Sequence, residues 1–298
     1  MNFKFVYTFC VLVGCIGIVF SSAGQTFRNN IRDISEPFVV SADSIFSRYG
    51  SNAQQLALSL DKAKAYPSGP DIHLAPVSKE KLTASEIFDK AKHATVIMGS
   101  AYLCPHCSHT HVSNATGYII ATEGVVVTNY HVLRGFVDME GGNRPLSLLA
   151  RTYEGKTYGV KEVLYASEQD DLVVLKLDAD QSFSALGLSS GARVGDDAYV
   201  LGHPRGMYYY FTKGMVNSKF QEQTGGEDRG EQKFSDVMTI SADYAAGASG
   251  GPVLDVAGNL IGTVSSTRTF TYNDDASSVQ MIVKYAIPVE SLRRLIGR

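Results

Sequence analysis

Short apolar runs, separated by turns rich in glycine, asparagine and aspartate, dominate the chain from Ala94 onward. Runs of this kind are typical of β-strands. The expected strands are Ala94–Leu103, Gly117–Thr122, Gly124–Tyr130, Tyr158–Ala166, Leu172–Leu177, Ala198–Leu201, Gly214–Lys219, Phe234–Ser241, Pro252–Asp255, Leu260–Ser265 and Val279–Ile287. Because no helical stretches alternate with them, the pattern favours an all-β fold of two closed antiparallel barrels over a parallel sheet.

The chain before Ala94 has helical features instead. Thr83 and Glu86 have the spacing of a capping box, and they predict a short helix that continues to about Lys92. A leucine cluster within Asn52–Ala63 indicates a second helical segment, although its periodicity is mixed.

Glycine, proline and serine at residues 66–70 mark a linker between these segments. We therefore expect residues 25–82 to form a partly helical or flexible extension, followed by a domain over residues 83–298. Within that domain, the polar stretch 222–230 is expected to be an exposed hairpin tip.

The first residues have the layout of an export signal. Lys4 is the only positive charge before an uncharged apolar run from Phe5 to Phe20, and small residues follow this run. The arrangement predicts a signal peptide over residues 1–24 and a periplasmic or secreted protein. Two alternatives keep the protein at a membrane: retention of this segment as an anchor, or lipidation of Cys15 within a stretch that resembles a bacterial lipobox.

The composition fits an ordinary globular protein. Of the 298 residues, 44% are hydrophobic and 19% are charged, and the net charge of −3 provides no excess of basic residues. The balance argues against a nucleic acid as the partner.

Beyond the signal segment, the chain has two cysteines, Cys104 and Cys107, in the order Cys-Pro-His-Cys, with His109 and His111 close behind. A disulfide in an oxidising compartment is the first interpretation. A metal site built from the thiolates and histidines and a redox-active cysteine pair are the alternatives.

Three segments together have the composition of an acyl-transfer site. Ser249 lies among glycines, His131 follows an apolar run, and Asp171 precedes another. A serine hydroxyl needs a neighbouring base to become a nucleophile, and a carboxylate can orient that base. Asp170 competes for the role of the carboxylate, but Asp171 directly abuts the expected strand Leu172–Leu177.

The glycines around Ser249 have a chemical purpose in this interpretation. The backbone N–H groups of Gly247 and Ser249 would form an oxyanion hole. A glycine at 247 allows the peptide backbone to approach a substrate without a side-chain clash. The reaction needs no cofactor or metal, and its partner would be a polypeptide substrate.

The order and spacing of these blocks resemble trypsin-fold serine proteases of the HtrA/Deg group. The matching segments are Thr128–Leu133, Asp171–Lys176, Gly247–Pro252, Glu86–Ala91, Leu201–Gly206, Gly262–Ser265 and Tyr285–Pro288. The resemblance implies two six-stranded Greek-key barrels, at about 94–185 and 190–298, with the catalytic cleft between them. Because the chain ends shortly after Ile287, we do not expect a PDZ-like domain.

Substrate preference is the point on which the sequence leaves alternatives open. Asp243, six residues before Ser249, has the offset at which trypsin-like enzymes place a carboxylate for basic P1 side chains, where P1 precedes the scissile bond. HtrA-type relatives instead prefer small aliphatic P1 residues, and Tyr244 would fill the pocket. The expected pocket residues are Asp243, Tyr244, Ser265, Ser266 and Thr267. By resemblance, Ser265 would also hydrogen-bond the triad aspartate.

The residues thus predict an exported serine endopeptidase that uses His131, Asp171 and Ser249. Two alternatives belong to other classes: a binding protein with a protease fold and no turnover, and a thiol-redox or metal-binding protein that uses the Cys104–Cys107 region.

Overall fold

The computed structural model describes residues 26–65, 69–224, 233–272 and 278–297. The expected signal peptide with Cys15, the centre of the expected linker, and residues 225–230 of the expected hairpin tip lie outside the described residues. The helical elements are η1 (Asn30–Ser35), α1 (Glu36–Tyr49), α2 (Ala53–Ala65), α3 (Ala84–Ala91), α4 (Tyr130–Val137), η2 (Pro204–Gly206) and α5 (Val289–Leu295).

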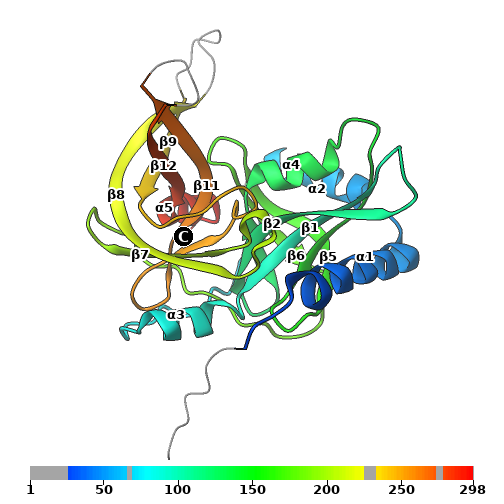
Figure 1. The fold of residues 1–298 in the computed structure, drawn as a ribbon, viewed down its shortest axis with the longest axis horizontal. Coiled ribbons are helices and arrows are strands. Elements are labelled where there is room, and N and C mark those ends of the chain that lie inside the picture. The colour runs from blue at the N-terminus through cyan, green and yellow to red at the C-terminus, as the bar shows by residue number, and fades with distance from the viewer. Residues whose placement is uncertain (1–25, 66–68, 225–232, 273–277, 298) are drawn as a thin grey trace, which may run out of the picture.

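The strands form two closed barrels that lie side by side (Figure 1). The first barrel has the order β1-β2-β3-β6-β5-β4 and the second has the order β10-β11-β12-β9-β8-β7. The first comprises β1 (Thr95–Leu103), β2 (Thr110–Ala121), β3 (Val125–Thr128), β4 (Arg144–Arg151), β5 (Thr157–Ser167) and β6 (Leu172–Leu177). The second comprises β7 (Asp197–Gly202), β8 (Tyr210–Thr224), β9 (Lys233–Ile240), β10 (Pro252–Leu254), β11 (Leu260–Thr271) and β12 (Val279–Pro288). All named pairs are antiparallel, and the prediction of two six-stranded barrels is confirmed.

Each barrel has an apolar interior, and a third apolar cluster joins the two. Leu201, Leu254 and Tyr118 are fully buried in this shared cluster. The hydroxyl groups of Tyr118 and Thr263 also form a 2.6 Å hydrogen bond from one barrel to the other. Burial of a continuous apolar interface fixes the relative position of the barrels, and therefore of the residues at their junction.

Three elements of the first barrel differ from the prediction. Strand β2 begins at Thr110, seven residues before the expected Gly117. Strand β4 was not expected, because Pro145 and the polar residues around it interrupt its apolar pattern, yet it pairs with β1 and β5. The expected strand Gly124–Tyr130 ends at Thr128, and α4 begins at Tyr130. In the second barrel, the expected hairpin tip begins too early, since Glu222 to Thr224 still pair with β9.

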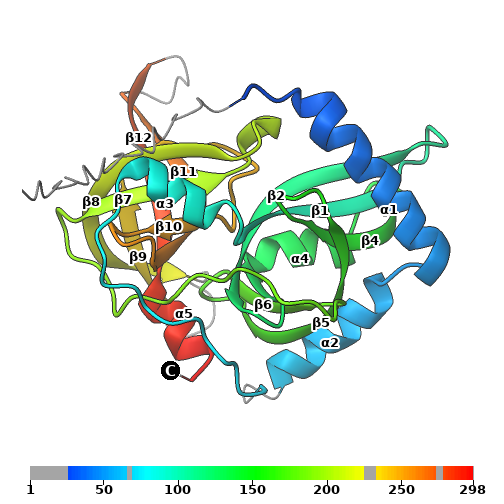
Figure 2. The same cartoon turned by 90° about the horizontal axis from the view of Figure 1, so that it is seen from below.

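The N-terminal extension packs along the outside of the first barrel (Figure 2). Helix α1 buries Phe38 and Ala42 against strands β1 and β4, and α2 buries Leu56 and Leu60 in the core of the first barrel. Thr83 and Glu86 form the predicted capping box at the start of α3. Among the described residues, no helix combines the length and the apolar character that crossing a bilayer requires.

Candidate active site

His131 and Asp171 meet where α4 follows β3. The Nδ1 atom of His131 lies 2.9 Å from one carboxylate oxygen of Asp171 and 3.1 Å from the other, and the backbone N–H of His131 also donates to this carboxylate. An imidazole held in this way presents its other nitrogen, Nε2, away from the carboxylate. The arrangement suits a general base with a fixed tautomer.

Neighbouring residues hold Asp171 in an unusual backbone conformation. Its φ of 51° lies in the left-handed region, which L-residues seldom adopt. Its carbonyl accepts hydrogen bonds from the side chain of the buried Asn129 and from the backbone N–H of Tyr130. The turn before β6 is therefore fastened to the N-terminus of α4, which carries His131.

Asp170 points to different partners. Its carboxylate accepts a hydrogen bond from Ser167 and lies 3.5 Å from the guanidinium of Arg294. Of these two adjacent carboxylates, that of Asp171 is the one beside His131.

Ser249 lies on the turn between β9 and β10 and shares a hollow of about 350 Å³ with His131. Ser100, Ser113 and Asn114 of the first barrel line the same hollow. The Ser249 hydroxyl donates to the carbonyl of Ser265 at 3.3 Å, and no hydrogen bond joins it to His131 among the described residues. Catalytic hydrogen bonds are often long or misaligned before substrate binds.

The turn before Ser249 can provide two backbone donors. Among the described residues, the N–H groups of Gly247 and Ser249 donate to no other group. Gly247 has a φ of +98°, and a Cβ at this position would lie 2.7 Å from the carbonyl of His203. Gly250 has a φ of +81°, and a Cβ there would lie 2.2 Å from the Thr128 hydroxyl. Both positions therefore require glycine. In this turn the N–H groups of Gly247 and Ser249 remain available to an oxyanion.

Thr116 of β2 fastens this turn to the first barrel, a role that sequence reasoning missed. Its hydroxyl donates to the carbonyl of Gly247 at 2.8 Å and accepts from the backbone N–H of His203 at 3.1 Å. Its own backbone N–H donates to the carbonyl of Ser249. A single threonine within a strand carries no sequence signal for contacts so distant along the chain.

His203, interpreted from sequence as a turn residue, is fully buried behind the same turn. Its Nδ1 accepts a hydrogen bond from the backbone N–H of Tyr209, which identifies a neutral ring protonated at Nε2. Burial lowers the pKa of His203 to about 3. We therefore find no role for it in proton transfer.

The candidate specificity residues do not form an acidic pocket. Asp243 is 72% exposed, and its carboxylate pairs with Lys284 Nζ at 2.8 Å. Tyr244 is buried, and its hydroxyl lies within hydrogen-bond distance of the carbonyls of Ser266 and Tyr285. The charge of Asp243 is thus balanced by Lys284 at the surface, while the Tyr244 ring fills space between strands.

The remaining pocket candidates lie on β11. Ser265 contributes its carbonyl to the Ser249 hydroxyl, and the Asp171 carboxylate is bound by His131 rather than by Ser265 within the described residues. Ser266 and Thr267 are exposed.

Cys104, Cys107 and His111 converge at the loop between β1 and β2. The two Sγ atoms lie 2.9 Å apart as free thiols, and the Nε2 atom of His111 lies 2.9 Å from Cys107 Sγ. His109 is not part of this group of side chains. The cluster has no residue in common with the triad.

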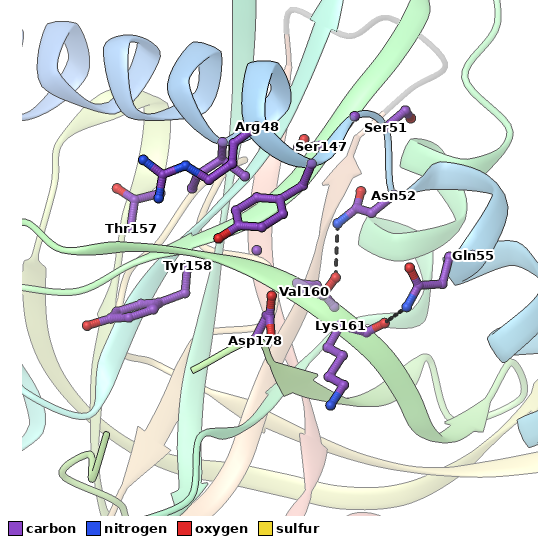
Figure 3. Close-up of a pocket in the computed structure, with 14 residues that line it drawn as sticks. Arg48, Ser51, Asn52, Gln55, Ser147, Thr157, Tyr158, Val160, Lys161 and Asp178 are labelled. Atoms are coloured by element: carbon purple, nitrogen blue, oxygen red, sulfur yellow. Dashed lines mark hydrogen bonds between the residues drawn. The ribbon is translucent and has the colours of Figure 1, made fainter. Parts of the chain in front are cut away.

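A further hollow lies between the extension and the first barrel (Figure 3). The side-chain amide of Asn52 donates to the carbonyls of Leu148 and Val160, and that of Gln55 donates to the carbonyl of Lys161. These amides occupy backbone acceptors of β4 and β5, so they fasten the junction of α1 and α2 to the barrel.

Known proteins are similar to this chain in sequence and in fold. Residues 115–262 match the model of the trypsin-like peptidase domain. The chain is therefore similar to trypsin-like peptidases, and to Do-like and DegP-like proteases in particular. It is similar to the chloroplastic Protease Do-like 1 from Arabidopsis thaliana, with 27% identity over 188 residues, which are 62% of this chain and 39% of the relative. It is 31% identical over 184 residues to a probable periplasmic DegP-like serine endoprotease from Chlamydia trachomatis, which covers 61% of this chain and 33% of the relative.

A solved structure of an HtrA-type protease with decapeptide has the same fold as the peptidase domain. The TM-score is 0.53 and the identity is 21%, over 73% of this chain and 68% of the other. The chain spans only about a third to two fifths of the length of the two curated relatives named above.

Proposed function

We propose that this chain is an exported serine endopeptidase that hydrolyses peptide bonds through an acyl-enzyme intermediate. The 2.9 Å contact between His131 and Asp171, beside a hollow shared with Ser249, is the observation that carries the proposal. The names of the relatives, which are proteases of the periplasm or the chloroplast, support both the activity and the export.

The residues divide the reaction between them. In this reaction the Ser249 hydroxyl turns from the carbonyl of Ser265 towards Nε2 of His131, which removes its proton as Oγ attacks the substrate carbonyl. The N–H groups of Gly247 and Ser249 bind the oxyanion, and such a donor contributes about 2.7–4 kcal/mol to transition-state stabilisation. His131 then protonates the leaving amine. In the second half of the reaction, His131 takes a proton from the attacking water and returns it to Ser249 Oγ as the acyl group leaves.

Cleavage of an unfolded polypeptide tests this function. The wild-type protein is expected to produce new peptide N-termini, and Ser249→Ala is expected to produce none while retaining the wild-type unfolding temperature. Equal rates of cleavage by the two proteins would overturn the assignment.

We further propose that the peptidase prefers small or medium apolar P1 residues. The pairing of Asp243 with Lys284 supports this preference, because a carboxylate that is already neutralised and exposed gains little from a basic side chain. In a peptide library, we expect cleavage after small or medium apolar residues, with the same profile for Asp243→Asn. Cleavage after arginine or lysine that is lost in Asp243→Asn would contradict the proposal.

A further inference from the structure

Two thiols and one imidazole, all common metal ligands, converge at the β1–β2 loop and the start of β2, outside the catalytic site. The donor atoms of Cys104, Cys107 and His111 all lie within 4.8 Å of one another. Each of these side chains is half-buried, whereas His106 and His109 of the same loop are exposed. The cluster is therefore a defined group rather than a general excess of histidine.

The histidine distinguishes a metal site from a simple cysteine pair. A disulfide requires only the two sulfurs, yet Nε2 of His111 points at Cys107 Sγ from 2.9 Å. The His111 ring stacks on Tyr102, with centroids 5.3 Å apart and planes inclined by 26°. Tyr102 and His111 are also paired in register across β1 and β2, so the sheet itself fixes the direction of the imidazole.

The donor set selects the kind of ion. Thiolate and imidazole are the preferred ligands of Zn²⁺, which bonds sulfur at about 2.3 Å and nitrogen at about 2.0–2.1 Å. Donors at tetrahedral positions around such an ion are farther apart than 2.9 Å, so a slight outward movement of this loop would admit the ion. Three protein ligands leave the fourth position for water or an external ligand.

We propose that Cys104, Cys107 and His111 bind one Zn²⁺ ion through two thiolates and one imidazole, with an open fourth position. The site lies on the same hairpin that contributes Ser100 and Ser113 to the hollow at Ser249. The proposal does not depend on peptidase activity.

The test uses the full chain with Ser249→Ala, so that self-digestion cannot remove the loop. The reduced protein is stripped with a chelator and titrated with Zn²⁺, and Co²⁺ serves as the spectroscopic probe. We expect one ion per chain by native mass spectrometry and a thiolate-to-cobalt charge-transfer absorption. His109→Gln, in the same loop but outside the cluster, is expected to bind as tightly as the parent protein.

Cys107→Ser and His111→Gln should each weaken binding by at least about 100-fold, since loss of even an outer-shell partner of a metal ligand costs about 10–100-fold. His111→Gln serves as the deciding variant if Cys107→Ser does not fold. Absence of stoichiometric binding by the reduced protein, a Cys104–Cys107 disulfide that persists in reductant, or unchanged binding by His111→Gln would overturn the proposal.

Discussion

The hydroxyl of Thr116, in the first barrel, donates a 2.8 Å hydrogen bond to the carbonyl of Gly247, in the second. This bond directs the Gly247 carbonyl towards β2. Thr116 is fully buried, and it also binds the carbonyl of Ser249 through its backbone. The oxyanion turn of one barrel is therefore positioned by a strand of the other.

Removal of this hydroxyl should slow the chemical step. Thr116→Val removes this hydrogen bond and the one from the His203 N–H, and we expect it to lower kcat by about 3–10-fold with little change in KM. Thr116→Ser retains the hydroxyl and should restore most of the rate. Steady-state kinetics with one peptide substrate measure both values, and a loss confined to KM would refute a role in positioning the turn.

The two adjacent carboxylates should differ sharply in their importance. Asp171→Asn preserves the shape of the side chain but favours the wrong histidine tautomer, so we expect kcat to fall by about 10⁴-fold. Asp170→Asn is the matched control, because Asp170 contacts Ser167 and Arg294. Comparable losses in the two variants would show that the carboxylate has been assigned incorrectly.

The N-terminal extension should contribute to stability rather than remain loosely attached. Leu60 is 1% exposed and packs in the core of the first barrel, whereas Leu58 on the same helix is 65% exposed. Leu60→Ala should lower the free energy of unfolding by about 2–5 kcal/mol. Leu58→Ala should change it by less than about 0.5 kcal/mol. Urea unfolding provides the comparison, and a neutral Leu60→Ala would mean that α2 does not pack on the barrel in solution.

Buried His203 should make stability depend on pH. The unfolded chain binds a proton at this imidazole near pH 6.5, but the pKa in the folded chain is about 3. Between these two values only the unfolded chain binds the proton. The free energy of unfolding is therefore unaffected above pH 6.5 and falls as the pH decreases towards 3, by up to about 1.4 kcal/mol per pH unit.

His203→Asn removes this titration while its side-chain oxygen can still accept from Tyr209. Between pH 7 and pH 5, we expect the wild-type protein to lose about 2 kcal/mol more of its unfolding free energy than the variant. Urea unfolding at the two pH values measures the difference. Identical losses would indicate that His203 is already charged, or solvated, in the native protein.

Local sequence patterns were sufficient for much of the fold. Apolar runs bounded by turn residues predicted most strands, and the capping box predicted the start of α3. Strand β4 was missed because Pro145 and Arg151 make its pattern resemble a surface segment, although α1 covers it. Helix α1 was not predicted, although Glu36 and Pro37 in its first turn are start signals; the Ser35 side chain makes no capping hydrogen bond.

For the candidate site, the reactive residues could be predicted from the sequence, but the residues that position them could not. Ser249, His131 and Asp171 stand in motifs with recognisable neighbours. Thr116 does not, because its function depends on contacts with residues more than eighty positions away. The pairing of Asp243 with Lys284 likewise follows from the register of the second barrel, which no local pattern reveals.

Labelling with a fluorophosphonate tests the central claim most directly, because this reagent reacts only with a serine that has been activated as a nucleophile. Intact-mass measurement should show one adduct per wild-type chain, located at Ser249 by peptide mapping. Ser249→Ala should show none, and Asp171→Asn should label far more slowly than Asp170→Asn. A wild-type protein that is folded but unlabelled, or that is labelled equally in Ser249→Ala, would contradict the account.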